Sequence, residues 1–128
     1  MVAVLENDEN EIVRAEIAQS LSKFGELAEI AVPSLINSMR LDNSKEVRKW
    51  SVIALGEIGP KAEPAITALI EMMQQDESQI LRKNALLALG KIGNENKKVL
   101  LALKKFEREN NDWWVKSIVG SIIQKISS

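Results

Sequence analysis

The chain has 128 residues, of which 45% are hydrophobic and 27% charged, and its 17 basic and 18 acidic residues leave a net charge of −1. This length suits one domain with a hydrophobic core, and the near-neutral charge argues against attraction to nucleic-acid phosphates. With no cysteine and only short apolar runs, we expect no disulfides and no passage through a membrane. The start, "MVAVLENDEN", lacks the basic and apolar parts of a signal peptide, so we expect a cytoplasmic protein.

The first predicted element is the tail of a helix in residues 1–8, which match residues 36–42. An amphipathic helix follows in residues 13–25, and its pattern returns every 34 residues, in 47–59, 81–93 and 115–127. The segments "VRKWSVIALGEIG" and "LRKNALLALGKIG" share seven of thirteen residues. Apolar positions fall on one face of an α-helix in each copy, and a fixed period of this length predicts a helical repeat protein.

A second apolar stripe with helical spacing lies between successive copies, at Val32, Leu35, Ile36 and Met39 and again at Ile66, Leu69, Ile70 and Met73. Pro33 and Pro64 stand near the starts of these helices, where a missing N–H costs nothing. We therefore expect each unit to contain two helices joined by short turns.

The predicted turns have residues suited to ending and starting helices. Gly59 and Gly93 are placed as residues that follow a helix and can adopt positive φ, and Pro60 prevents continuation of the helix before it. The segments Asp-Asn-Ser at 42–44 and Asp-Glu-Ser at 76–78 supply turn and N-cap residues for the next helix.

The last unit departs from the pattern. Asn110 replaces the turn aspartate and Lys116 replaces the arginine of the preceding copies. We expect the helix over 96–108 to rotate, so that its buried side chains are Val99, Leu100, Leu103 and Phe106. Such changes fit a terminal unit whose outer face meets water.

One hairpin cannot bury both of its apolar stripes, whereas stacked hairpins share a continuous core. We therefore expect an all-α fold, a superhelix of stacked helical hairpins, in one domain over residues 1–128. Its units run roughly over residues 1–25, 26–59, 60–93 and 94–128.

These residues resemble the HEAT repeats, in particular the short bacterial type also found in phycobilisome lyase subunits. The resemblance is carried by "DNSKEVRKWSVIALGEIGPKAEPAITALIEMM" and "DESQILRKNALLALGKIG", and more loosely by residues 8–41. The tetratricopeptide and ankyrin signatures are absent. The resemblance implies a HEAT/armadillo-type solenoid, and a ladder of hydrogen bonds between units from Arg14, Arg48 and Arg82 to the turn residues Asp8, Asp42 and Asp76.

Candidate chemistry is sparse. The chain has no histidine, which removes the commonest general base and the His-Glu pairs that HEAT-like deoxyhypusine hydroxylases use for iron. The carboxylates of Asp8, Glu9, Glu11, Asp76 and Glu77 cluster at helix starts, where capping and the helix dipole account for them. We expect no catalytic residues, no metal and no cofactor, and therefore a protein that is not an enzyme.

The resemblance implies that the second helix of each pair lines the concave face. On the side of these helices opposite the core stripe, helical geometry places Lys45, Lys49, Ile53, Lys83, Leu87 and Trp113. A mixed apolar and basic strip indicates a protein-binding groove for an acidic, partly hydrophobic segment. The alternative is that superhelical curvature partly buries Ile53 and Leu87. We expect Trp114 inside, Trp113 exposed, and Trp50 packed between repeats.

The leading functional interpretation is a noncatalytic protein-protein interaction module or scaffold, acting alone or as the HEAT-repeat end of a larger regulatory protein. A second follows from the resemblance, namely a subunit or chaperone related to bilin chromophore lyases. A third is DNA binding of the HEAT-like glycosylase kind, with lysine and tryptophan lining the groove. The net charge disfavours the third, so we expect a protein partner and no nucleic acid.

Overall fold

The structure, a computed structural model, describes residues 2–93 and 96–127. Within these residues the secondary structure is entirely helical and contains no strand. The α-helices are α1 (Val2–Asn7), α2 (Glu11–Phe24), α3 (Val32–Leu41), α4 (Lys45–Ile58), α5 (Ile66–Gln75), α6 (Gln79–Ile92), α7 (Lys97–Glu109) and α8 (Trp113–Ser127). Two 3₁₀ segments, η1 (Gly25–Ala31) and η2 (Gly59–Ala65), follow α2 and α4. The predicted all-α class is confirmed.

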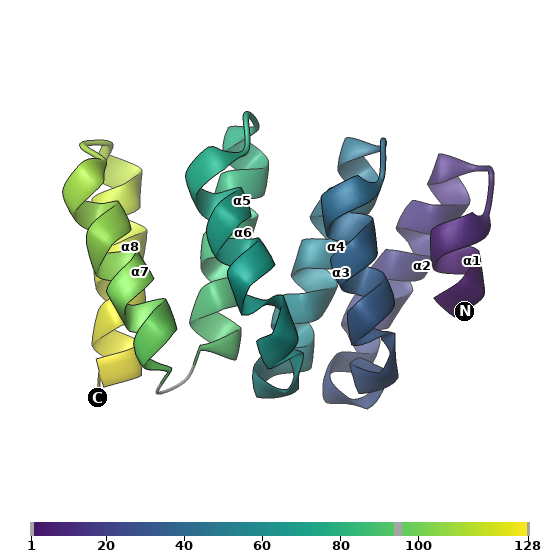
Figure 1. Cartoon of the computed structure of the whole chain (residues 1–128), viewed down its shortest axis with the longest axis horizontal. Helices are drawn as coiled ribbons and strands as arrows, with labels where there is room; N and C mark the ends of the chain where they lie inside the picture. Colours follow the sequence, from purple (N-terminus) through teal and green to yellow (C-terminus); the bar gives the residue numbers. More distant parts are fainter. Residues whose placement is uncertain (1, 94–95, 128) are drawn as a thin grey trace.

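The helices form a row of antiparallel pairs in two layers, with the chain termini at opposite ends of the row (Figure 1). The first helices, α1, α3, α5 and α7, make one layer, and the second helices, α2, α4, α6 and α8, make the other. Along the second layer α2 packs on α4, α4 on α6, and α6 on α8. This arrangement confirms the predicted solenoid of stacked helical hairpins.

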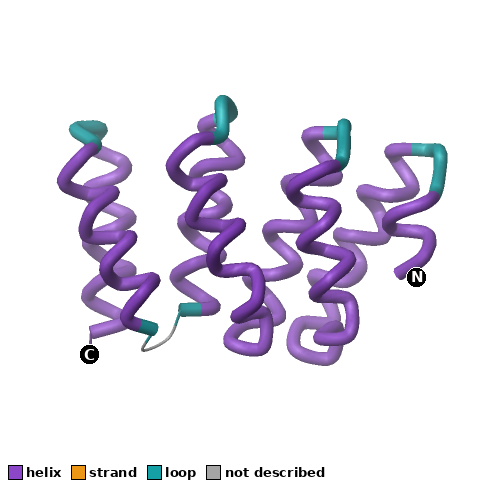
Figure 2. Tube along the Cα trace, viewed as in Figure 1, coloured by secondary structure: helices purple, strands orange, loops and turns teal. Residues whose placement is uncertain are grey.

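Polar side chains fix where the second helices begin. The Oγ atoms of Ser44 and Ser78 accept hydrogen bonds from the backbone N–H groups of Val47 and Leu81, each at 3.3 Å. Asn10 caps α2 in the same way through a 2.8 Å bond from the N–H of Ile12. These bonds satisfy backbone donors that a helix start otherwise leaves without partners. The connections at this end of each pair are the short loops coloured teal in Figure 2.

The connections from α2 to α3 and from α4 to α5, at the opposite end of the pairs, are longer than the short turns we expected. Each of η1 and η2 is a seven-residue 3₁₀ segment, interrupted by non-helical backbone angles at Ala28 and Ala62. The change of direction occurs at Gly25 and Gly59, whose φ angles are +54° and +79°. Such angles are accessible to glycine at little cost, so the glycines allow the chain to turn from the end of an α-helix directly into a 3₁₀ segment.

The expectation of positive φ at Gly93 was wrong, because its φ is −82°. Glycine is needed there for space. A Cβ atom would lie 2.6 Å from Cγ1 of Val99 and 2.8 Å from the carbonyl oxygen of Leu89. The start of α7 therefore packs directly over the backbone at the end of α6.

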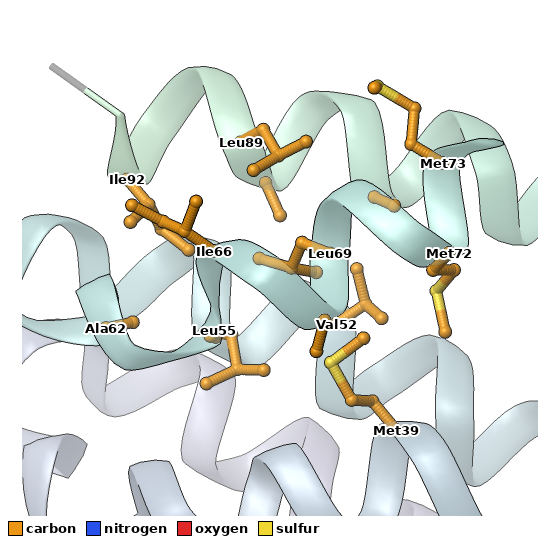
Figure 3. Close-up of a cluster of buried hydrophobic side chains, with 14 of the residues drawn as sticks. Met39, Val52, Leu55, Ala62, Ile66, Leu69, Met72, Met73, Leu89 and Ile92 are labelled. Carbon is orange, nitrogen blue, oxygen red and sulfur yellow. The ribbon is translucent and has the colours of Figure 1, made fainter. Parts of the chain in front are cut away.

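The core is continuous along the row and is made by side chains from both layers. Figure 3 shows part of it, where Leu55 and Leu89 from the second layer meet Ile66 and Leu69 from α5. Leu55 and Leu89 are fully buried, as their places in the apolar stripe predict. In the last pair α7 buries Val99, Leu103 and Phe106 and half-buries Leu100, which is the rotated stripe that we expected.

Two glycines inside helices allow the second layer to pack closely. A Cβ atom on Gly56 would lie 3.1 Å from the Cα of Ala88 in the next helix. A Cβ atom on Gly90 would lie 3.1 Å from Cγ2 of Ile122. The intrinsic cost of glycine in a helix, about 1 kcal/mol relative to alanine, is therefore offset by close contact between neighbouring units.

Candidate functional site

The outward sides of α4 and α6 carry the lysine and apolar residues singled out from the sequence. Lys45 and Lys83 are exposed, and Leu87 is 40% exposed. Ile53 is half-buried. The two apolar positions of the strip therefore differ: Leu87 is open to a ligand over much of its side chain, whereas Ile53 is partly covered by its neighbours.

Lys49 is less available than the sequence suggests. Its Nζ atom lies 3.1 Å from Oε2 of Glu46 and 5.0 Å from the centroid of the Trp50 ring. The side chain is 25% exposed. An ion pair and a cation–π contact thus hold Lys49 against its own helix, and Trp50 packs against the core as a half-buried residue.

The two adjacent tryptophans at the start of α8 point to different environments. Trp113 is 80% exposed, and Trp114 is half-buried and packs against the core. An indole exposed to this extent leaves a large apolar area in water, and tryptophan is enriched among residues that anchor protein interfaces. Trp113 is thus a further exposed apolar residue of the second layer in addition to Leu87, and Ile12 and Ile80 of the same layer are also exposed, at 64% and 59%.

The arginine ladder forms its full inter-unit contact at the first junction. Arg14 donates from Nε to Oδ2 of Asp42 at 2.9 Å and from Nη2 to Oδ1 at 3.1 Å, and its Nη1 donates to the backbone oxygen of Asp8 at 2.6 Å. The hydrogen bond to Asp42 is the main cause that raises the pKa of Arg14 above its ordinary value. The guanidinium therefore stays charged and joins the first two units.

At the later junctions the arginines bind only backbone oxygens among the described residues. Arg48 donates from Nη1 to the carbonyl of Asp42 at 2.8 Å, and Arg82 donates to the carbonyl of Asp76 at 2.7 Å. The implied ladder thus has one carboxylate rung, between Arg14 and Asp42, and two positions where the arginine is held by its own turn.

The aspartates of the turns have structural contacts of their own. One carboxylate oxygen of Asp8, Asp42 and Asp76 accepts the backbone N–H two residues later, at 2.8, 2.9 and 2.8 Å. These bonds shape the turn before each second helix. Within residues 2–93 and 96–127 no three carboxylates come close enough together to hold a metal ion.

The sequence reasoning did not single out an apolar group at the end of α2 and in η1. Phe24 is 52% exposed, and Leu27 and Ile30 are 86% and 85% exposed. The repeat offered one signal, because Phe24 aligns with the buried Ile58 and Ile92. Phe24 is therefore exposed at a position that is buried in the two following units.

Across the described part of the chain, no helix is both long and apolar enough to cross a membrane. A search of curated proteins found no match to this sequence. A family model of HEAT repeats matches residues 1–56 and again residues 32–122. The stacked helical pairs, the 34-residue period and this match together show that the chain belongs to the HEAT-repeat family.

Proposed function

We propose that this protein is a noncatalytic interaction module that binds a protein partner along the outward side of its second helices. HEAT repeats are generally protein-interaction scaffolds. The observation that carries the proposal is the exposure of Leu87 and Trp113 in the second layer, at 40% and 80%. Large apolar side chains beside exposed lysines are typical of a surface that a partner covers.

The residues of the strip contribute in different ways. Leu87 and Trp113 supply apolar area that becomes buried on binding, which is the usual source of interface affinity. Lys45 and Lys83 are exposed and supply positive charge at the rim, where charge acts mainly on the rate of encounter. Ile53 is half-buried and offers less of its side chain to a partner than Leu87 does. A partner with acidic side chains around an apolar segment fits this distribution.

Lys49 has a smaller part in this proposal than Lys45 and Lys83. Its charge is already compensated by Glu46 at 3.1 Å, and its side chain lies along Trp50. A partner carboxylate would have to displace that contact before it could pair with Lys49. Charge complementarity from this helix therefore comes mainly from Lys45.

The test is capture of binding proteins from a native lysate, followed by measurement with the purified partner. Leu87→Asp should abolish capture, because a carboxylate buried in an apolar contact without a counter-charge is costly. Leu101→Asp is the matched control, since Leu101 is a 68% exposed leucine within α7 of the other layer. Both variants should melt close to the unmodified chain.

Equal capture by the Leu87→Asp chain would mean that the partner uses another face. Loss of capture in the Leu101→Asp chain would point to the first layer instead. The alternative of a subunit or chaperone related to bilin lyases draws on sequence resemblance alone. Fluorescence of a bilin mixed with the purified chain, recorded with and without added apo-acceptor protein, tests that alternative separately.

A further inference from the structure

The three junctions between successive pairs hold an arginine in the same way. In each, Nη1 of the arginine donates to the backbone oxygen six residues earlier: Arg14 at 2.6 Å, Arg48 at 2.8 Å and Arg82 at 2.7 Å. The shared bond fixes one edge of each guanidinium at its own turn. The other edge, formed by Nε and Nη2, remains free to meet a group from the next unit.

At the first junction that second edge is occupied by a carboxylate. Nε and Nη2 of Arg14 donate to the two oxygens of Asp42, and the two side chains are only 14% and 9% exposed. A planar guanidinium and a carboxylate match in this two-point geometry. The first junction therefore shows that the Nε and Nη2 edge of an arginine held in this way can bind a carboxylate.

At the third junction the corresponding residue is a neutral asparagine, which lines the same cavity as Arg82 and bonds to its own helix. The repeat aligns Asn110 with Asp42, and Nδ2 of Asn110 donates to the backbone oxygen of Phe106 at 2.9 Å. Among the residues that the structure describes, no carboxylate pairs with Arg82. At the second junction Asp76 occupies the aligned position and lines a cavity together with Arg48, although no ion pair between the two side chains forms among the described residues.

A cavity of about 310 Å³ lies at this third junction, between the end of α5, the starts of α6 and α8, and the end of α7. Arg82, Lys105 and Gln74 offer it hydrogen-bond donors, and Phe106 and Trp114 supply apolar walls. Two carboxylates also line it. Glu109 is within 4.0 Å of Lys105, and Asp112 lies in the turn before α8.

We propose that this cavity binds the carboxylate of an aspartate or glutamate side chain from an acidic segment of a partner protein. The carboxylate takes the place at Arg82 that Asp42 takes at Arg14. This inference rests on the proposed function, because the side chain would come from the same acidic partner that we propose for the strip at Lys83 and Leu87, which belong to the same helix as Arg82. It adds a defined anchoring point for one acidic side chain.

The test uses the full ¹⁵N-labelled chain and reads the Nε–Hε signals of its arginines by NMR. The probe is N-acetyl-aspartate amide, and the matched control probe is N-acetyl-asparagine amide, which has the same shape without the charge. At constant ionic strength, the aspartate probe should cause a saturable shift at Arg82 and none at Arg14, whose second edge is filled. The asparagine probe should leave both unchanged.

A variant that fills the site from within provides the decisive comparison. Asn110→Asp restores the carboxylate found at the first junction, so it should remove the response of Arg82 to the probe. An Arg82 shift no larger than that of Arg14, or one that persists in Asn110→Asp, would overturn the proposal. So would a response that appears only in Asp112→Asn, because Asp112 of the chain itself would then fill the cavity.

The two proposals can fail independently. The NMR titration reads Arg82 without any partner, and Leu87→Asp should leave its response intact. If the aspartate probe does not shift Arg82 while Leu87→Asp still abolishes capture from lysate, the carboxylate site is wrong and the protein-binding strip stands. If Arg82 responds and Leu87→Asp binds normally, the site stands and the strip is wrong.

Discussion

Arg14 and Asp42 form a two-point ion pair across the first junction, although 28 residues separate them in the chain. Both side chains are largely buried, at 14% and 9% exposure, so the contact is shielded from water more than a surface ion pair. Because Asp42 also accepts the N–H of Ser44, the same carboxylate links a unit boundary to the start of α4. The pair therefore couples the stacking of two units to the formation of a helix.

Arg14→Ala should lower the free energy of unfolding by about 1–3 kcal/mol, the range for hydrogen bonds to charged groups that lose a partner. Arg48→Ala should cost less, because the described contacts of Arg48 are to backbone oxygens only. Urea unfolding of both variants measures the difference. Equal losses would show that the Asp42 carboxylate adds nothing to the contact between units.

Leu55→Ala and Leu89→Ala should each cost about 2–5 kcal/mol, since truncation of a buried leucine loses apolar contacts and leaves a cavity. Both residues are fully buried at equivalent places in α4 and α6. Leu101→Ala is the control and should change stability by about 0.5 kcal/mol or less, as is usual for exposed positions. Thermal and urea unfolding would reveal a wrongly assigned core if both buried variants lost under about 1 kcal/mol.

Gly56→Ala and Gly90→Ala should differ in their effect on stability. Each gains about 1 kcal/mol of helix propensity. At Gly56 the new Cβ meets the backbone Cα of Ala88 at 3.1 Å, so a whole helix must move. At Gly90 it meets the γ carbons of Ile122 at 3.1 and 3.2 Å, and a side chain can yield by a few tenths of an ångström without a shift of the whole helix. We expect a lower melting temperature for Gly56→Ala than for Gly90→Ala, and the reverse order would contradict this account.

The ion pairs of Lys61 predict that the folded state loses stability at high pH. Its Nζ lies 3.1 Å from Glu26 and 3.7 Å from Glu29, and the hydrogen bond to Glu26 is the main cause that raises the pKa of Lys61. Because the pKa of Lys61 is higher in the folded state, the stability that these ion pairs contribute is fully present below the unfolded-state pKa. It is lost as pH rises through the folded-state pKa. NMR titration should give Lys61 a lower pKa in Glu26→Gln, and an unchanged pKa would exclude the pair as its cause.

The period of the repeat allowed the stacked architecture and its buried positions to be predicted, because burial of a helical face depends on residue spacing. The caps at Ser44 and Ser78 were predictable for a similar reason, since they depend on local hydrogen bonds. The 3₁₀ segments and the negative φ of Gly93 were not, because they depend on how the next helix packs. The neutralisation of Lys49 by Glu46 needed side-chain positions that no pattern specifies.

The candidate strip shows the same limit. Helical geometry put Ile53 and Leu87 at equivalent outward positions, yet Ile53 is half-buried and Leu87 is 40% exposed. The difference arises from contacts between neighbouring helices, which the spacing within one helix does not contain. Leu87 is therefore the sharper probe of partner binding, and a polar substitution at Ile53 would also disturb the fold.

Lys83→Glu should slow association with the captured partner while changing dissociation little. Lys83 is exposed and no described residue pairs with it, so its charge acts over distance on an approaching acidic surface. Leu87→Asp, four residues later on the same helix, should instead speed dissociation, because it removes apolar contact formed only in the complex.

Stopped-flow or surface-binding kinetics at several salt concentrations separate the two effects. The association rate of the unmodified chain should fall as salt rises, and that dependence should be weaker in Lys83→Glu. An association rate that is insensitive to both salt and Lys83→Glu would show that the partner does not meet this face through charge.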